Sequence, residues 1–427
     1  MSRVLELTDE RRRSLGRLVA LLVDRRATWE RAAASAEVRE VEVLRPGRPG
    51  LLDVIAAVGR RTAHAVLGLR RPGEPHHHLV RAVDEPVLGA FEDDDGPGVA
   101  VDAVLDGELV ALVLGTVTGT AVDGEPVALL RDDEEGVTLG FGERCTFTVF
   151  PWVGDGARPG VELLVALDDA GFNHLSAPIA VWRRGGRDLG LVQEPLAGPA
   201  DGWALALTSL RDLYGSGGAP EAAGGDFAPE ARALGTMTAR MHLALVRAYG
   251  RQDAWVSDWV SAVESRVRRR DPSLLETEGV AETIGALEGS YLQAPALRTH
   301  GDFHLGRTAR TDQGWVVADC DPGGVAPGSS APEPRSPLAD VADMLWSLHH
   351  VAVASAGERD PGGRLGLGAL SQAWAARNRR AFLGGYLGTP GVEALVPSDR
   401  EVIRRLAAVF ELDHAARAAG GRAAGPV

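Results

Sequence analysis

The first third of the chain combines one helical pattern with a series of short apolar runs. Leucine and arginine recur from Leu5 to Ala34, which predicts an amphipathic helix. Turns rich in Gly, Pro and Asp then separate short runs of β-forming residues. These runs predict a small, mainly antiparallel β domain without evident chemistry, and between residues 38 and 119 they are VREVEVL, LLDVIAAVG, AHAVLGL, PVLGAF, GVAVDAVL and ELVALVLG.

A second β-rich segment runs from Ala128 to Val153 and is followed by one helical stretch. Its apolar residues form short runs around a turn at Gly140 to Arg144, as in a hairpin. The expected elements are strands at 137–140, 145–150, 179–182 and 189–194, with a helix at 160–169 between the second and third strands.

From Gly202 onward the apolar positions mostly follow helical spacing. One helix carries signals at both ends, with Asp226 as a candidate N-cap, Pro229 in the first turn and Gly250 as the stop. A Gly/Pro/Ser-rich loop at 323–336 and the tail at 420–427 are expected to be irregular and mobile. Further helices are predicted at 254–270, 277–292, 337–355, 367–387 and 399–418.

Two short acidic motifs, HGDFH at 300–304 and DCD at 319–321, flank a hairpin-like segment. The run GWVVA predicts a short buried strand that ends at Asp319. Phosphoryl transfer needs one carboxylate to accept the proton of an attacking hydroxyl and another to hold Mg²⁺ on the nucleotide phosphates. Aspartates beside glycine are also common in turns, but the paired motifs, with His304 close to Asp302, favour a catalytic site.

Composition narrows the class of protein. The 427 residues allow two or three domains, each with its own core. A net charge of −14 argues against nucleic acid or an anionic membrane as the main partner. Two distant cysteines, Cys145 and Cys320, exclude a disulfide scaffold and favour a reducing compartment. All 45 basic residues are arginine, so any mechanism that requires a lysine is excluded.

Targeting signals are not evident in the chain. The N-terminal stretch lacks an apolar signal core, and no apolar run reaches membrane-spanning length. We therefore expect a soluble, cytoplasmic protein. Zinc-type spacing of Cys and His is absent, and the triplet at 76–78 lies in a polar loop where histidines are usually solvated.

The order of several motifs resembles actinobacterial maltokinases and the related glucosamine kinases, within the aminoglycoside-phosphotransferase-like kinase superfamily. The motifs are HGDFHLG, then WVV before DCD, then SPLADVADML. Supporting segments are LVQEPLAGPADGWALAL, LGTMTARMHLAL, NRRAFLGGY and FELDHA. The match covers roughly residues 130 to 415, and the β-rich segment before it would correspond to the N-terminal cap of maltokinases.

This resemblance implies an α+β fold of the protein-kinase-like, bilobal type. Residues 1–125 would form the cap domain, 126–200 the nucleotide-binding lobe, and 201–427 a mainly helical lobe with the catalytic and metal motifs. The cofactors would be ATP and Mg²⁺, and the substrate a sugar or amino sugar.

The resemblance also assigns roles to individual residues. Asp302 would be the catalytic base, and Asp319 would bind Mg²⁺ with Asp321 as a second ligand or support. Asp340 would anchor the catalytic loop, although it could equally cap the helix after Pro337. The remaining candidates are Gln193, Glu194 and Pro195 as the adenine hinge, Glu162 on the lobe helix (where the macrodipole alone also favours an acidic residue), Thr148 and Arg307 near the phosphates, and His300 and His304 beside the base.

Three departures from the family pattern bear on activity. Thr148 stands at about the position of the phosphate-contacting lysine, and losing such a charge costs ~10²-fold or more in rate. Arg307 replaces the usual Gln or Asn, so it cannot ligate Mg²⁺ but could place a positive charge on phosphate. The chain also ends soon after FELDHA, so aromatic platforms for a sugar would come from Trp346, Trp374 or Phe382, for which core packing is the commoner role.

These observations leave three hypotheses. The first is an ATP-dependent sugar kinase, with transfer of the γ-phosphoryl group to a sugar or amino-sugar hydroxyl. The second is a degenerate kinase fold that binds or regulates a protein partner, because the lysine is missing and Arg307 is unusual. The third is a phosphotransferase for an aminoglycoside or another cationic acceptor.

Overall fold

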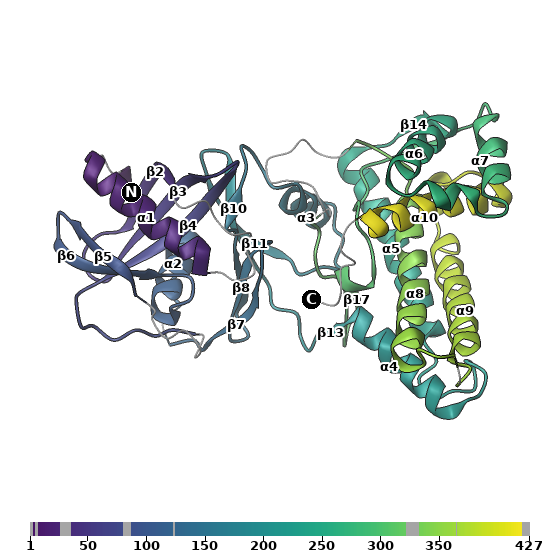
Figure 1. Ribbon diagram of the computed structural model, residues 1–427, viewed down its shortest axis with the longest axis horizontal. Helices are drawn as coiled ribbons and strands as arrows, with labels where there is room; N and C mark the ends of the chain where they lie inside the picture. Colours follow the sequence, from purple (N-terminus) through teal and green to yellow (C-terminus); the bar gives the residue numbers. More distant parts are fainter. Residues whose placement is uncertain are drawn as a thin grey trace. The chain divides into compact units, whose positions relative to one another are not determined.

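The computed structural model describes residues 3–4, 7–25, 36–79, 87–122, 124–321, 333–363 and 365–420 (Figure 1). Most of the predicted mobile loop and tail therefore lie outside the described residues. The chain divides into two compact units. The first comprises Met1–Glu162 and Ala177–Pro195, and the second comprises Leu163–Ser176 with most of the chain from Leu196. The predicted boundary at 125/126 falls within the first unit, and the three-part division remains a prediction.

The first unit begins with an antiparallel sheet in the order β1-β2-β3-β4-β6-β5. Helix α1 (Asp9–Arg25) packs buried leucines and valines onto this sheet, together with Leu52, Leu67 and Phe91 of the strands. The short strand β10 (Trp152–Val153) also pairs with β4. The strands are β1 (Arg3–Val4), β2 (Glu37–Arg45), β3 (Gly50–Val58), β4 (Arg61–Arg70), β5 (Val87–Asp93) and β6 (Gly96–Asp102).

The prediction of a strand at ELVALVLG was wrong, because this segment forms helix α2 (Gly107–Thr118). Asp106 caps the helix by accepting hydrogen bonds from the backbone N–H groups of Glu108 and Leu109. Gly119 ends it in the left-handed conformation with φ of 71°. The apolar residues that suggested a buried strand instead form the buried face of a helix that has a capping residue at each end.

A second antiparallel sheet, in the order β11-β12-β9-β8-β7, completes the first unit. Buried charges connect the two sheets: Asp53 Oδ1 of β3 lies 3.1 Å from His64 Nε2 of β4, and its Oδ2 lies 2.8 Å from Arg184 of β11. The predicted order of two strands, a helix and two strands is found as β8 (Val137–Phe141), β9 (Cys145–Val149), α3 (Pro159–Asp169), β11 (Pro178–Arg184) and β12 (Arg187–Gln193). Strand β7 (Val127–Asp132), which was not predicted as a separate strand, precedes them.

The second unit is mainly helical, as predicted. Two predicted helices are shorter than expected. The helix predicted at 254–270 begins at Val256, because Ala254 and Trp255 belong to β14, and the helix predicted at 277–292 extends only from Val280 to Glu288. The elements are α4 (Gly202–Ser216), α5 (Ala228–Tyr249), β14 (Gln252–Trp255), α6 (Val256–Arg270), α7 (Val280–Glu288), β15 (Gln293–Ala296), α8 (Leu338–Arg359), α9 (Leu367–Leu387) and α10 (Arg400–Gly420). No helix in the described part of the chain is long and apolar enough to cross a membrane.

Helices α5 and α9 approach each other closely because glycines line their contact. A Cβ atom on Gly235 of α5 would lie 2.1 Å from the carbonyl oxygen of Phe382 in α9. A Cβ atom on Gly385 of α9 would lie 2.0 Å from the carbonyl oxygen of Arg232 in α5. This close approach lets His242 on α5 reach Tyr386 on α9, with 2.9 Å between His242 Nδ1 and the phenol oxygen.

We therefore expect Gly235→Ala to lower the free energy of unfolding by about 1–3 kcal/mol, because the helices must separate to admit the methyl group. Gly357→Ala is the matched control, since Gly357 lies in α8 with nothing within 4 Å of its virtual Cβ. The control substitution should stabilise the protein by about 0.5–1 kcal/mol. Urea unfolding of both variants measures the difference, and equal effects would contradict this view of the α5–α9 contact.

Candidate active site

The acidic motifs come together through the hairpin formed by β16 (Thr308–Thr311) and β17 (Gly314–Val317). The register pairs Thr308 with Val317, and the N–H of Ala318 donates to the carbonyl of Arg307 at 2.9 Å. Residues just before β16 and just after β17 therefore lie side by side. This register brings Arg307 next to Asp319.

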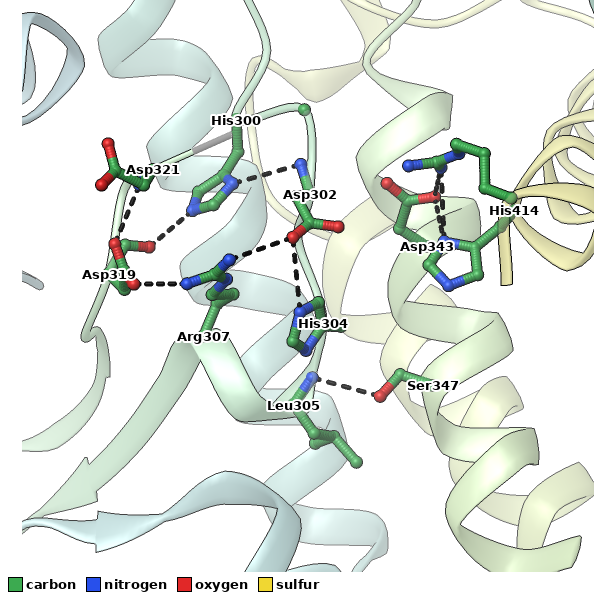
Figure 2. A network of polar contacts seen from close by, with 12 residues as sticks. His300, Asp302, His304, Leu305, Arg307, Asp319, Asp321, Asp343, Ser347 and His414 are labelled. Carbon is green, nitrogen blue, oxygen red and sulfur yellow. Dashed lines mark hydrogen bonds and ion pairs between the residues drawn. The ribbon is translucent and has the colours of Figure 1, made fainter. Parts of the chain in front are cut away.

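Arg307 bridges the two aspartates that the sequence marks as base and metal ligand (Figure 2). One guanidinium nitrogen, NH2, lies 3.3 Å from Asp302 Oδ2, and the other, NH1, contacts Asp319 Oδ2 directly. The second oxygen of Asp319, Oδ1, accepts the backbone N–H of Asp321 at 2.9 Å. Both carboxylate oxygens of Asp319 therefore have hydrogen-bond donors in the free protein.

Two histidines hold the loop around Asp302. His300 Nδ1 accepts the N–H of Asp302 at 3.4 Å, which leaves Nε2–H to donate to the carbonyl of Asp319 at 2.8 Å. His304 Nε2 lies 3.6 Å from Asp302 Oδ2. Burial alone would raise the pKa of Asp302, but the interaction with His304 and the charge of Arg307 lower it. Asp302 is therefore an ionised carboxylate at neutral pH.

Asp340 on α8 holds this loop through two hydrogen bonds to its backbone. Its Oδ2 accepts the N–H of His300 at 2.8 Å, and its Oδ1 accepts the N–H of Gly301 at 2.9 Å. Gly301 has φ of 91°, a conformation that favours glycine. His242 of α5 lies 3.1 Å from the same Oδ2. The side chain of Asp340 therefore contacts the loop and does not cap its own helix. The N–H of Leu338, in the first turn of α8, donates instead to the Oγ atom of Ser336 at 3.3 Å.

Sequence reasoning missed a second polar cluster, which Figure 2 shows across from Asp302 and His304. Asp343 of α8 is buried, with Oδ1 2.7 Å from His414 Nδ1 and 2.6 Å from Arg417, both of α10. Its Oδ2 is buried without a hydrogen-bond partner in the parts of the chain that are described. Trp346 stacks on His350 at 4.4 Å and packs against His414 at 4.2 Å between ring centroids.

This cluster and the Asp302 loop share one helix. Ser347 of α8 accepts the N–H of Leu305 at 3.2 Å, so α8 holds the loop at a second point. The negative charge of Asp302 also acts on Arg417 of α10. Burial lowers the pKa of Arg417, but the charges of Asp343, Asp413 and Asp302 raise it, and the net effect is a raised pKa. The sequence did contain a signal for this cluster. Asp340, Asp343 and Trp346 in SPLADVADMLW are spaced three residues apart, which places them on one face of a helix.

The residues that the sequence suggested for nucleotide binding, other than Arg307, belong to the first unit. Thr148 is buried on β9, and its Oγ1 lies 2.9 Å from that of Thr138, which makes a neutral pair. Glu162 is exposed in the first turn of α3. Gln193 ends β12, the N–H of Glu194 donates to the carbonyl of Ala177 at 2.9 Å, and Pro195 ends the unit.

Few carboxylates are available for a metal ion here. No group of three or more His, Cys, Asp or Glu side chains in the described residues is arranged to hold one. Mg²⁺ that arrives on a nucleotide needs only one or two protein carboxylates, because the phosphates and water supply the other ligands. Asp319 and Asp321 fit that requirement.

The contacts of Asp340 lead us to expect that the stability of the fold depends on pH. Burial raises its pKa, but the interaction with His242 and the backbone N–H of Gly301 lower it overall, so the carboxylate stabilises the fold above its unfolded pKa near 4. We expect Asp340→Asn to cost about 3 kcal/mol or more at pH 7, because an amide N–H would face backbone N–H groups. Chemical unfolding should show this difference from pH 8 to about 5 and its decline below about pH 4. A pH-independent difference would contradict the role of the charge.

Comparison with curated proteins supplies the family. No family model matches the chain. The chain is 31% identical over 384 residues to a glucosamine kinase of Streptacidiphilus jiangxiensis, covering 82% of both proteins. It is 29% identical over 224 residues to a glucosamine kinase of Mycolicibacterium smegmatis, covering 47% of this chain and 53% of that protein.

Comparison with solved structures supports the fold. The chain matches a glucosamine kinase in complex with glucosamine, ADP and inorganic phosphate with a TM-score of 0.63 and 19% identity, over 97% of this chain and 94% of that one. A further crystal form of glucosamine kinase matches with a TM-score of 0.64 and 20% identity, over 97% and 93%. The predicted α+β, protein-kinase-like fold class is confirmed. Together with the sequence match over four fifths of its length, this shows that the chain belongs to the glucosamine kinase family.

Proposed function

We propose that this protein transfers the γ-phosphoryl group of Mg·ATP to a hydroxyl of an amino sugar, with glucosamine as the leading candidate. The observation that carries the proposal is the ionised Asp302, held on an Asp340-anchored loop and bridged by Arg307 to Asp319. Family membership supports the activity, since the two curated relatives are glucosamine kinases.

In this proposal Asp302 accepts the proton of the attacking hydroxyl. The sugar oxygen forms a bond to the γ-phosphorus, the bond from that phosphorus to the β,γ-bridging oxygen breaks, and ADP leaves with the electron pair. A carboxylate with a lowered pKa is ionised and available throughout the neutral range. Asp319 and Asp321 would hold the Mg²⁺, which supplies neutralising charge on the phosphates.

The cluster around Asp343 is suited to the acceptor. The buried Oδ2 of Asp343 lacks a hydrogen-bond partner among the described side chains and would accept a hydrogen bond from an ammonium or hydroxyl group. The Trp346 ring is already stacked on His350 and packed against His414, so it is part of this cluster rather than an open face for a sugar. Trp374 and Phe382, the other aromatic candidates from the sequence, are buried in the core and do not supply such a face.

The alternatives are less well supported. A regulatory protein without catalysis explains the missing lysine, but it gives no reason for an anchored, ionised Asp302 opposite Asp319. An aminoglycoside acceptor is a variant of the same chemistry with a larger cationic substrate. The cytoplasm is the proposed location because ATP is there, and neither protein partners nor nucleic acid enter the proposed reaction.

An acceptor panel tests the proposed substrate class. Steady-state ADP release is measured with glucosamine, N-acetylglucosamine, maltose and an aminoglycoside as acceptors. Acceptor-dependent release that is greatest for glucosamine is the expected result. Release that is independent of every acceptor, or a clear preference for maltose, would overturn the amino-sugar assignment.

We expect Asp302→Asn to lower turnover by about 10²–10⁴-fold, because the amide cannot accept the proton of the acceptor hydroxyl. Nucleotide affinity, measured as the rise in melting temperature with Mg·ATP, should persist. Asp312→Asn is the matched control, since Asp312 is exposed between β16 and β17 of the same hairpin and should leave turnover unchanged. Turnover of Asp302→Asn within tenfold of the native protein would rule out Asp302 as the base.

A further inference from the structure

Arg307 occupies a position that usually belongs to a metal ligand. In protein kinases the residue five places after the catalytic aspartate is an asparagine that holds the second of two Mg²⁺ ions. Arg307 stands five places after Asp302, and a guanidinium has only donors and cannot ligate a metal ion. Its side chain is 13% exposed and points between Asp302 and Asp319.

The guanidinium and a metal ion compete for the same oxygen. Asp319 Oδ1 accepts the N–H of Asp321 and Oδ2 contacts Arg307, so a cation that binds Asp319 through Oδ2 must displace the guanidinium. When Mg²⁺ binds at Asp319, the guanidinium loses that contact and needs a new anion. Phosphate oxygens are the natural replacement, because the planar guanidinium binds them through two parallel hydrogen bonds.

We propose that Arg307 binds the transferring phosphate in place of one of the two metal ions, so that the loaded site holds a single divalent cation at Asp319 and Asp321. This inference rests on the proposed kinase function and adds which positive charges, one metal ion and one guanidinium, would neutralise the phosphates. The missing lysine strengthens it: Thr148 is neutral and hydrogen-bonded to Thr138, so fixed positive charge on the phosphates must come from arginine. Arg307 is the arginine that already lies between the two catalytic carboxylates.

Metal stoichiometry tests this inference without any measurement of activity. Mn²⁺ replaces Mg²⁺ as a paramagnetic probe, and β,γ-imido-ATP serves as a non-hydrolysable nucleotide. Titration followed by electron paramagnetic resonance should give one bound Mn²⁺ per native chain. Arg307→Gln restores an amide at this position and should give two, with nucleotide affinity about tenfold or more weaker because a charge-assisted bond to phosphate is lost. Arg307→Lys keeps the positive charge and should still give one.

The outcomes separate this inference from the proposed function. Two Mn²⁺ ions on the native chain, with normal nucleotide binding, would overturn the one-metal site and leave the kinase proposal standing. One Mn²⁺ ion and unchanged nucleotide affinity in Arg307→Gln would show that Arg307 is a structural ion pair. Absence of nucleotide binding by the native chain would overturn both. Two bound ions on the native chain would overturn the inference even where a variant fails to fold.

Discussion

The site depends on one buried carboxylate, that of Asp340. It is fully buried on α8, and it accepts hydrogen bonds from two consecutive backbone N–H groups of the HGD loop and contacts His242 from α5. Burial of a charge is costly unless such donors compensate it, so the loop and the two helices are held in one arrangement. Asp302 owes its position to this anchor, and the glycines between α5 and α9 allow His242 to reach it.

Electrostatics follow from that geometry. Once the loop is fixed, Asp302 and Asp319 lie close enough to share the guanidinium of Arg307, while His304 lies near the same oxygen of Asp302 that Arg307 contacts. Two carboxylates close together repel each other, and a shared cation offsets that repulsion. In the proposed reaction this guanidinium would supply the positive charge that a nucleotide phosphate needs. A chain without lysine can supply that charge in this way.

Much of the fold could be predicted from spacing alone. Strand and helix order in the nucleotide lobe and the helices of the second unit followed from local periodicity and end signals such as Pro229 and Gly250. The segment ELVALVLG was assigned to a strand because periodicity cannot separate a short buried helix from a short buried strand. Asp106 before it and Gly119 after it were the helix end signals that should have decided the assignment.

The site was only partly visible in the sequence. Motif order indicated Asp302, Asp319 and Asp340, because each stands in a short motif that can be recognised from its immediate neighbours in the sequence. The roles of His242 and His414 could not be predicted, since their partners Asp340 and Asp343 lie 98 and 71 residues away. Such contacts arise from helix packing, which local sequence patterns do not report.

In the proposed reaction this chain moves a phosphoryl group from ATP to an amino sugar. The ³¹P NMR spectrum of the native protein incubated with Mg·ATP and glucosamine follows that transfer directly. We expect loss of the γ-phosphate resonance, growth of ADP, and a new phosphomonoester resonance coupled to protons of the sugar ring or its hydroxymethyl group. An unchanged ATP spectrum, or release of inorganic phosphate alone, would contradict the proposed reaction.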